Sequence, residues 1–196
     1  MESTALGGDT VLERLLRGNR RFAAGCCRHP RQDTGRRNAL VSGQAPWAAI
    51  LSCADSRVPP ELIFDQGLGD LFVVRVAGSI INDHLLGSLE YAAVDLRVPL
   101  LMVLAHSNCG AVAAVASGAD LQGHMASLAP AIRPAVDRAG SMEGDLTDNA
   151  AREVARMTAG QLTASEPILA PLVRNGQLRI TAAFYHLAHG TVELLS

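Results

Sequence analysis

Three side chains in this sequence have the types and spacing that suit a metal ion. Cys53 ends an apolar run at residues 47–53, and His106 and Cys109 lie at the end of another at residues 99–106. Two thiolates and one imidazole suit Zn²⁺, and three protein ligands leave a fourth position open, as in catalytic zinc sites. Taken alone, each cysteine could instead be a small core residue, because buried cysteines are common.

Two charged residues follow Cys53 at alternate positions. In an extended segment Asp55 and Arg57 project to the same side as Cys53, so all three can face one cleft. A bidentate pair with Arg57 keeps Asp55 ionised, ready to accept a hydrogen bond from a metal-bound water. The same carboxylate could instead bind the zinc and close the site, or the pair could only cap the following helix.

The elements that must position these residues are short, continuous apolar runs at 47–53, 71–77 and 99–106. Such runs are typical of strands buried on both faces of a parallel sheet, and the pattern at 84–96 predicts a crossover helix. Ligands bind at the carboxyl edge of such sheets, where the candidate residues lie. The sequence therefore predicts an α/β fold with a central, mainly parallel β-sheet flanked by helices.

The rest of the chain is expected to complete this layout as one domain, 1–196, with an arm and connection at 1–46 and an α/β core at 47–196. An amphipathic helix is predicted from an N-cap at Asp9 or Thr10 to a stop at Gly25, its apolar stripe packing on a core or on a partner subunit. The further expectations are an extended connection at 26–46, a short helix with loops within 117–150, a helix at 149–164, and a strand, a turn at His189 and Gly190, and a C-terminal edge strand within 177–195.

Composition excludes several classes of function. The chain has 196 residues, 48% of them hydrophobic, and a formal net charge of −2, so it lacks the basic excess that nucleic-acid binding requires. Its most apolar stretch is too short for a membrane span, and the N-terminus does not resemble a signal peptide. Four cysteines without a disulfide-scaffold pattern indicate reduced thiols or metal thiolates. We therefore expect a cytoplasmic protein without nucleic-acid or membrane partners.

The motifs "CADSRV" at 53–58 and "HSNCG" at 106–110 resemble those of the β-class carbonic anhydrases. Four further blocks follow the family order: "LLRGNRRF" at 15–22, "GQAP" at 43–46, "GDLFVVRVAG" at 69–78 and "GSLEYA" at 87–92. The resemblance implies one Zn²⁺ per chain held by Cys53, His106 and Cys109, with Asp55 and Arg57 beside the metal. It also implies a four-stranded parallel sheet extended by a further strand.

The resemblance further implies an N-terminal arm laid over a neighbouring subunit, in a homodimer or a dimer of dimers. Gln44 matches a glutamine that reaches the substrate from across the dimer interface. The positions matching the substrate pocket are Phe72, Ala77 and Tyr91, and Gly110 follows the last ligand. Because Gln44 is present and Ile50 replaces the tryptophan of the allosteric subgroup, we expect an open zinc site.

The activity that the resemblance implies is the reversible hydration of CO2 to bicarbonate and a proton by attack of zinc-bound hydroxide. Two thiolates formally cancel the zinc charge, so we expect turnover that rises into alkaline pH. Two alternatives stay open: a related zinc hydrolase acting on carbonyl sulfide or carbon disulfide, and a non-catalytic zinc fold in which Asp55 closes the metal site.

Overall fold

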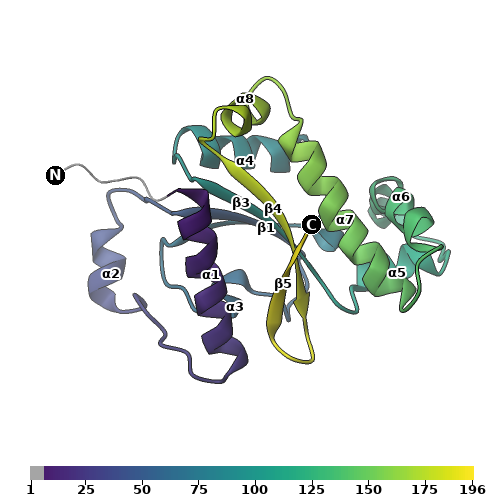
Figure 1. The fold of residues 1–196 in the computed structure, drawn as a ribbon, viewed down its shortest axis with the longest axis horizontal. Helices are drawn as coiled ribbons and strands as arrows, with labels where there is room; N and C mark the ends of the chain where they lie inside the picture. The colour runs from purple at the N-terminus through teal and green to yellow at the C-terminus, as the bar shows by residue number, and fades with distance from the viewer. Residues whose placement is uncertain (1–6) are drawn as a thin grey trace.

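The computed structural model describes residues 7–196 as an α/β fold around one five-stranded sheet (Figure 1). Its strands are β1 (Ala48–Ser52), β2 (Leu71–Arg75), β3 (Leu100–His106), β4 (Arg179–His186) and β5 (Thr191–Leu195), in the spatial order β2-β1-β3-β4-β5. The first four strands are parallel, and β5 pairs antiparallel with β4 at one edge. The predicted sheet and its C-terminal edge strand are confirmed.

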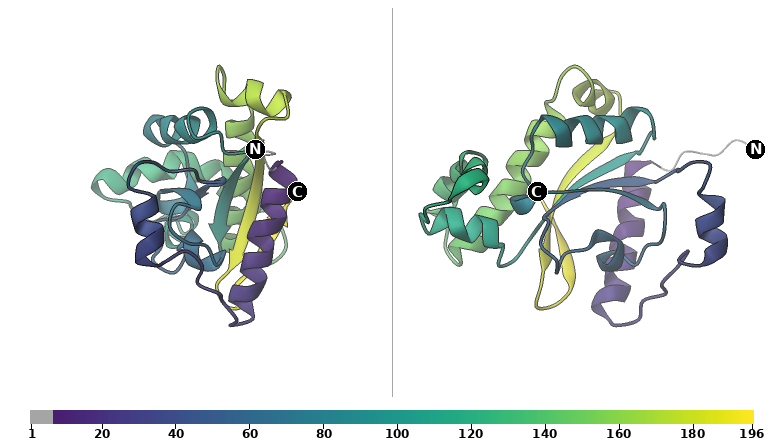
Figure 2. Two further views of the ribbon diagram at one scale, coloured as in Figure 1. Left: turned by 90° about the vertical axis from the view of Figure 1, so that its left-hand side faces the viewer. Right: turned by 180° about the vertical axis from the view of Figure 1, so that it is seen from behind.

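Helices lie on both faces of the sheet. The α-helices are α1 (Gly8–Ala23), α2 (Thr34–Ala39), α3 (Pro60–Ile63), α4 (Asp83–Val94), α5 (Gly110–Ala116), α6 (Ala129–Ala139), α7 (Leu146–Thr163) and α8 (Leu169–Arg174), and the 3₁₀ helices are η1 (Ala77–Ser79) and η2 (Gly123–Leu128). One core cluster joins the sheet to α4, α5, α6, α7 and α8, and a second joins it to α1 and α3. Figure 2 shows α1 on one side of the sheet and α4 on the other. Every residue of β1 and β3 is buried, as expected for strands covered on both faces.

The apolar stripe of α1 packs on its own chain. Val11, Leu12 and Leu15 are buried in one cluster with Ile50 and Met102 of the sheet. Of the two partners expected for this stripe, a core and a neighbouring subunit, the structure places the core of the same chain against it. Residues 1–6 of the expected arm lie outside the described residues.

Two expectations about helix ends and connections were wrong in part, and the helix expected within 117–150 is present. The N-cap of α1 is Gly7 rather than Asp9 or Thr10. The connection at 26–46 is not wholly extended, because Asp33 caps α2 by accepting the backbone N–H of Arg36. The helix within 117–150 is α6, which runs over eleven residues and includes Pro134.

Two further features of the helices bear on the site and on the expected partners. The helix predicted at 149–164 is α7, which begins at Leu146, because Asp145 caps it through the backbone N–H of Asp148. Within residues 7–196, no helix combines the length and the hydropathy needed to cross a membrane.

Candidate metal centre

The three predicted metal ligands come together at the carboxyl edge of the sheet. Cys53 follows the last residue of β1, His106 is the last residue of β3, and Cys109 directly precedes α5. Their ligand atoms all lie within 4.8 Å of one another, and all three side chains are buried. The two sulfurs are 4.0 Å apart. Two thiolates bound at about 2.3 Å to a tetrahedral Zn²⁺ are roughly 3.8 Å apart, so this spacing fits the ion.

The imidazole of His106 is set up as a ligand through its Nε2 atom. Its Nδ1 lies 2.9 Å from the carbonyl oxygen of Ser107, which can only accept a hydrogen bond, so Nδ1 carries the proton. Nε2 therefore presents a lone pair. That atom is fully buried and has no hydrogen-bond partner among the described residues. A buried, unpaired nitrogen is costly unless a metal satisfies it, and the Nδ1 contact is the usual outer-shell support of a ligating histidine.

The contact between the two sulfurs shifts the pKa values of the two thiols in opposite directions. The hydrogen bond from the Cys109 thiol lowers the pKa of Cys53 well below its ordinary value, and the Gly78 N–H, 3.4 Å from the Cys53 sulfur, adds to this. The same contact with Cys53, together with burial, raises the pKa of Cys109. Two thiolates this close together repel each other. A divalent cation between the sulfurs would offset this repulsion and allow both thiols to ionise. The donor set therefore fits zinc.

Asp55 lies beside the ligands and is held by Arg57. The guanidinium donates Nε–H to Oδ1 at 2.9 Å and Nη2–H to Oδ2 at 2.7 Å, and the backbone N–H of Arg57 also donates to Oδ1. These hydrogen bonds from Arg57 keep the pKa of Asp55 well below its usual range. Oδ2 is 3.9 Å from Nε2 of His106. The pair predicted from alternate spacing is confirmed as a contact, and the carboxylate faces the ligand cluster.

Two supporting residues were not singled out from the sequence. Arg75, at the end of β2, donates to the carbonyls of Cys53 at 3.0 Å and of Asp55 at 2.6 Å, and so fixes the backbone between them. Gly78 has a φ of 79°, which favours glycine, and its N–H reaches the Cys53 sulfur. Both residues lie in the block "GDLFVVRVAG", so their closeness to the motifs was the available signal.

The residues expected to line the substrate pocket are placed in two groups. Ala77 begins η1 directly before Gly78, and Gly110 begins α5 directly after the last ligand, so both adjoin the metal ligands. Phe72 and Tyr91 contact each other, with ring centroids 6.1 Å apart. Phe72 lies on β2, the neighbour of β1, and pairs in register with Ala49, four residues before Cys53. It is therefore nearer the start of the strands than the edge where the ligands lie.

Gln44 lies apart from the ligands of its own chain. It is an exposed loop residue that precedes β1, whereas Cys53 follows β1. The length of β1, about 16 Å at 3.3 Å per residue, separates the two ends. Within one chain, the structure does not bring Gln44 to the site.

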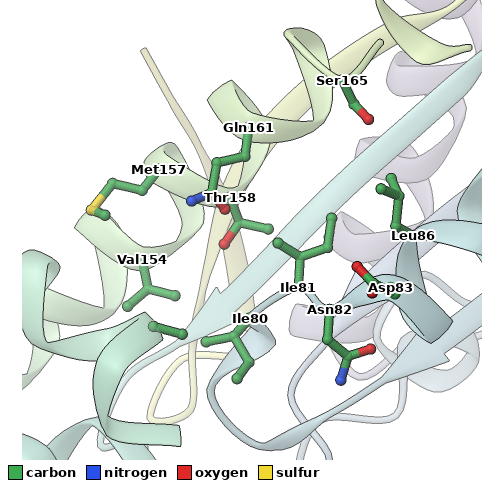
Figure 3. A pocket seen from close by; sticks show the side chains of 11 residues that line it. Ile80, Ile81, Asn82, Asp83, Leu86, Val154, Met157, Thr158, Gln161 and Ser165 are labelled. Atoms are coloured by element: carbon green, nitrogen blue, oxygen red, sulfur yellow. The ribbon is translucent and has the colours of Figure 1, made fainter. Parts of the chain in front are cut away.

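A separate cavity of about 300 Å³ lies between α7 and the segment that leads from η1 into α4 (Figure 3). Ile80, Ile81 and Asn82 line it on one side, and Thr158 and Gln161 of α7 on the other. None of the three metal ligands lines this cavity. It is therefore distinct from the metal centre.

Comparison with known proteins agrees with this geometry. A family model described as "Carbonic anhydrase" matches residues 48–192. The carbonic anhydrase of Mycolicibacterium smegmatis is 40% identical over 186 residues, covering 93% of this chain and 90% of the relative. Carbonic anhydrase 2 of Mycobacterium tuberculosis is 40% identical over 185 residues, covering 92% and 89%.

Solved structures show the same fold at lower identity. A Coccomyxa β-carbonic anhydrase, solved in complex with acetazolamide, is 27% identical with a TM-score of 0.72, covering 94% of this chain and 86% of that one. A β-carbonic anhydrase of Aspergillus fumigatus is 26% identical with a TM-score of 0.75, covering 95% and 91%. With a matching family model over most of its length, close relatives of one name and a Cys-His-Cys cluster at the sheet edge, this chain belongs to the β-carbonic anhydrase family.

Proposed function

We propose that this protein hydrates CO2 reversibly to bicarbonate and a proton, using one Zn²⁺ per chain held by Cys53, His106 and Cys109. The observation that carries the proposal is the buried, unpaired Nε2 of His106, aimed at two thiols that lie 4.0 Å apart. When bound there, zinc supplies a Lewis acid that makes a water molecule acidic enough to become a nucleophile near neutral pH.

Asp55 is proposed as the acceptor of the hydrogen bond from the nucleophilic water. Its carboxylate is ionised, faces Nε2 of His106 and is oriented by Arg57, so it can accept a hydrogen bond from the nucleophilic water and direct the remaining lone pair toward CO2. Both of its oxygens are engaged by Arg57. A carboxylate held in this way is a poor candidate for a fourth zinc ligand, which favours the open site over the non-catalytic alternative in which Asp55 closes it.

We also propose that the working form is a dimer or a dimer of dimers. Tyr91 and Val94 of α4 are 46% and 48% exposed, and Phe72, against Tyr91, belongs to the edge strand β2. Apolar side chains grouped beside a sheet edge favour covering by a second copy. A cytoplasmic location is proposed as well, because metal thiolates need a compartment that keeps cysteines reduced.

Stopped-flow CO2 hydration from pH 6.5 to 9, with zinc measured on the same sample, tests the proposal. We expect about one zinc per chain and turnover that rises with pH. Stoichiometric zinc without turnover at any pH would contradict the proposal. Assays with carbonyl sulfide and carbon disulfide on that sample would then distinguish the hydrolase alternative from a closed site.

A further inference from the structure

The backbone of Asn108 is held from both sides, and one of its partners comes from a helix outside the metal centre. Asn108 lies between the ligands His106 and Cys109 and has a φ of 52°, in the left-handed region. Its carbonyl accepts a hydrogen bond from Nη2 of Arg57 at 3.2 Å. Its N–H donates to Oδ1 of Asp148 at 2.8 Å. Asp148 is therefore joined directly to the loop that connects two of the three ligands.

The Asp148 carboxylate has a well-defined position because α7 packs on the core. Asp148 lies in the first turn of α7, and its own N–H donates to Oδ1 of the capping Asp145 at 2.8 Å. Further along the helix, Ala151 and Val154 are buried in the core cluster on the sheet. Unlike a surface loop, α7 can transmit the rigidity of the core to the ligand loop.

The ligand loop needs such an anchor. Only three residues connect β3 to α5, and a non-glycine residue in the left-handed region costs roughly 1 kcal/mol, which the surrounding contacts must offset. On the other side of the loop, Arg57 donates hydrogen bonds both to the Asn108 carbonyl and to the Asp55 carboxylate. The hydrogen bonds therefore form one chain from Asp148 through Asn108 and Arg57 to Asp55.

We propose that Asp148 is a positioning residue of the metal centre. Its carboxylate fixes the backbone of Asn108. Through that backbone it sets the direction of the Cys109 thiol and the position of the carbonyl that accepts the hydrogen bond from Arg57. Asp148 is not one of the three clustered ligands, and its carboxylate reaches the centre through the backbone of Asn108. The inference rests on the proposed zinc site and extends it by assigning an outer-shell support from α7.

A purely local role for Asp148 predicts a different result. A carboxylate in the first turn of a helix stabilises that helix through its dipole, and this would not alter metal retention. Asn149 provides a matched control, because its Nδ2 donates to the carbonyl of Glu143 at 3.0 Å and so anchors the same helix start without contacting the ligand loop.

The experiment compares the zinc-loaded, full-length protein with its Asp148→Ala, Asp148→Asn and Asn149→Ala variants. The rate of zinc transfer to a chromogenic chelator is measured along with the thermal unfolding of each variant. We expect Asp148→Ala to release zinc about 10–100-fold faster, the range typical for loss of an outer-shell partner. Asp148→Asn keeps an oxygen acceptor for the Asn108 N–H and should stay close to the unsubstituted rate. Asn149→Ala should lose stability without faster release.

Two outcomes would overturn the inference while leaving the proposed function intact. The first is release from Asp148→Ala at the unsubstituted rate. The second is equally fast release from Asn149→Ala at a matched loss of stability, which would reduce the effect to helix stability. If the unsubstituted protein takes up no zinc, the proposed function fails, and this inference fails with it. Full zinc loading with equal retention in all variants removes the inference alone.

Discussion

Arg57 donates a hydrogen bond to each carboxylate oxygen of Asp55, from Nε to Oδ1 at 2.9 Å and from Nη2 to Oδ2 at 2.7 Å. This two-point contact fixes the plane of the carboxylate as well as its charge. A single ionic contact would leave the carboxylate free to rotate toward the metal. The pair therefore determines how the Asp55 carboxylate is oriented toward the ligand cluster. Replacing Asp55 should distinguish its role as a proton acceptor from the binding of the metal.

The first prediction concerns Asp55→Asn. The amide keeps the size of the side chain but cannot accept a proton, so CO2 hydration should fall about 100-fold or more, as is typical for loss of a general base. Zinc content should stay at the unsubstituted level, because Cys53, His106 and Cys109 are untouched. Stopped-flow turnover and zinc analysis on one sample measure both effects. Asp83→Asn, which removes an acid from the first turn of α4, is the control for net charge. Unchanged turnover in Asp55→Asn would remove Asp55 from the mechanism.

The sequence predicted the ligand cluster because each ligand adjoins the end of an apolar run, and parallel strands bring their carboxyl ends to one edge. The supports of the cluster were harder to find. Asp148 meets Asn108 across 40 positions of sequence, and nothing in its local pattern marks it. The cap of α2 at Asp33 was visible locally, but the Arg and Pro content of that region favoured an extended chain. Long-range polar contacts therefore required the folded structure.

The second prediction is a pH-dependent contribution of Asp65 to stability. Burial alone would raise the pKa of this carboxyl, but hydrogen bonds from the Arg28 N–H, the Arg21 guanidinium and the His29 N–H outweigh it, so the pKa lies below its usual range. A lowered folded-state pKa means that the stabilisation is complete above the unfolded value, about 3.9, and is lost as pH falls through the folded value.

Asp65→Asn should therefore lower the free energy of unfolding at pH 7 by about 1–3 kcal/mol, the range for hydrogen bonds to a charged group. The difference from the unsubstituted protein should shrink as pH falls below about 4. Urea titrations at several pH values measure it, with the exposed Asp137→Asn as control. A difference that stays constant down to pH 3 would contradict this linkage.

The third prediction compares two helical glycines. A Cβ added at Gly18 of α1 would lie 1.8 Å from the carbonyl oxygen of Phe64, whereas one added at Gly160 of α7 would meet nothing within 4 Å. Gly18→Ala should lower the free energy of unfolding by about 1–3 kcal/mol, because α1 must move away from the backbone of Phe64 at the end of α3. Gly160→Ala should raise it by up to about 1 kcal/mol through helix propensity. Urea unfolding at fixed protein concentration and zinc load measures both. Equal effects of the two substitutions would show that the close approach of α1 is not needed for stability.

The fourth prediction tests whether Gln44 serves the site of a second subunit. Gln44 and Cys53 lie at opposite ends of β1, so Gln44 cannot complete the site of its own chain. Gln44→Ala and Asp55→Asn should each be poorly active alone. When the two variants are co-refolded, half of the dimers pair one of each, and in these the Gln44→Ala subunit keeps its own Asp55 and receives Gln44 from its partner. One complete site in half of the dimers gives about a quarter of the unsubstituted turnover per chain, as an isologous dimer requires. A mixture no more active than its components, or a fully active Gln44→Ala protein, would contradict the assignment of Gln44 to the neighbouring site.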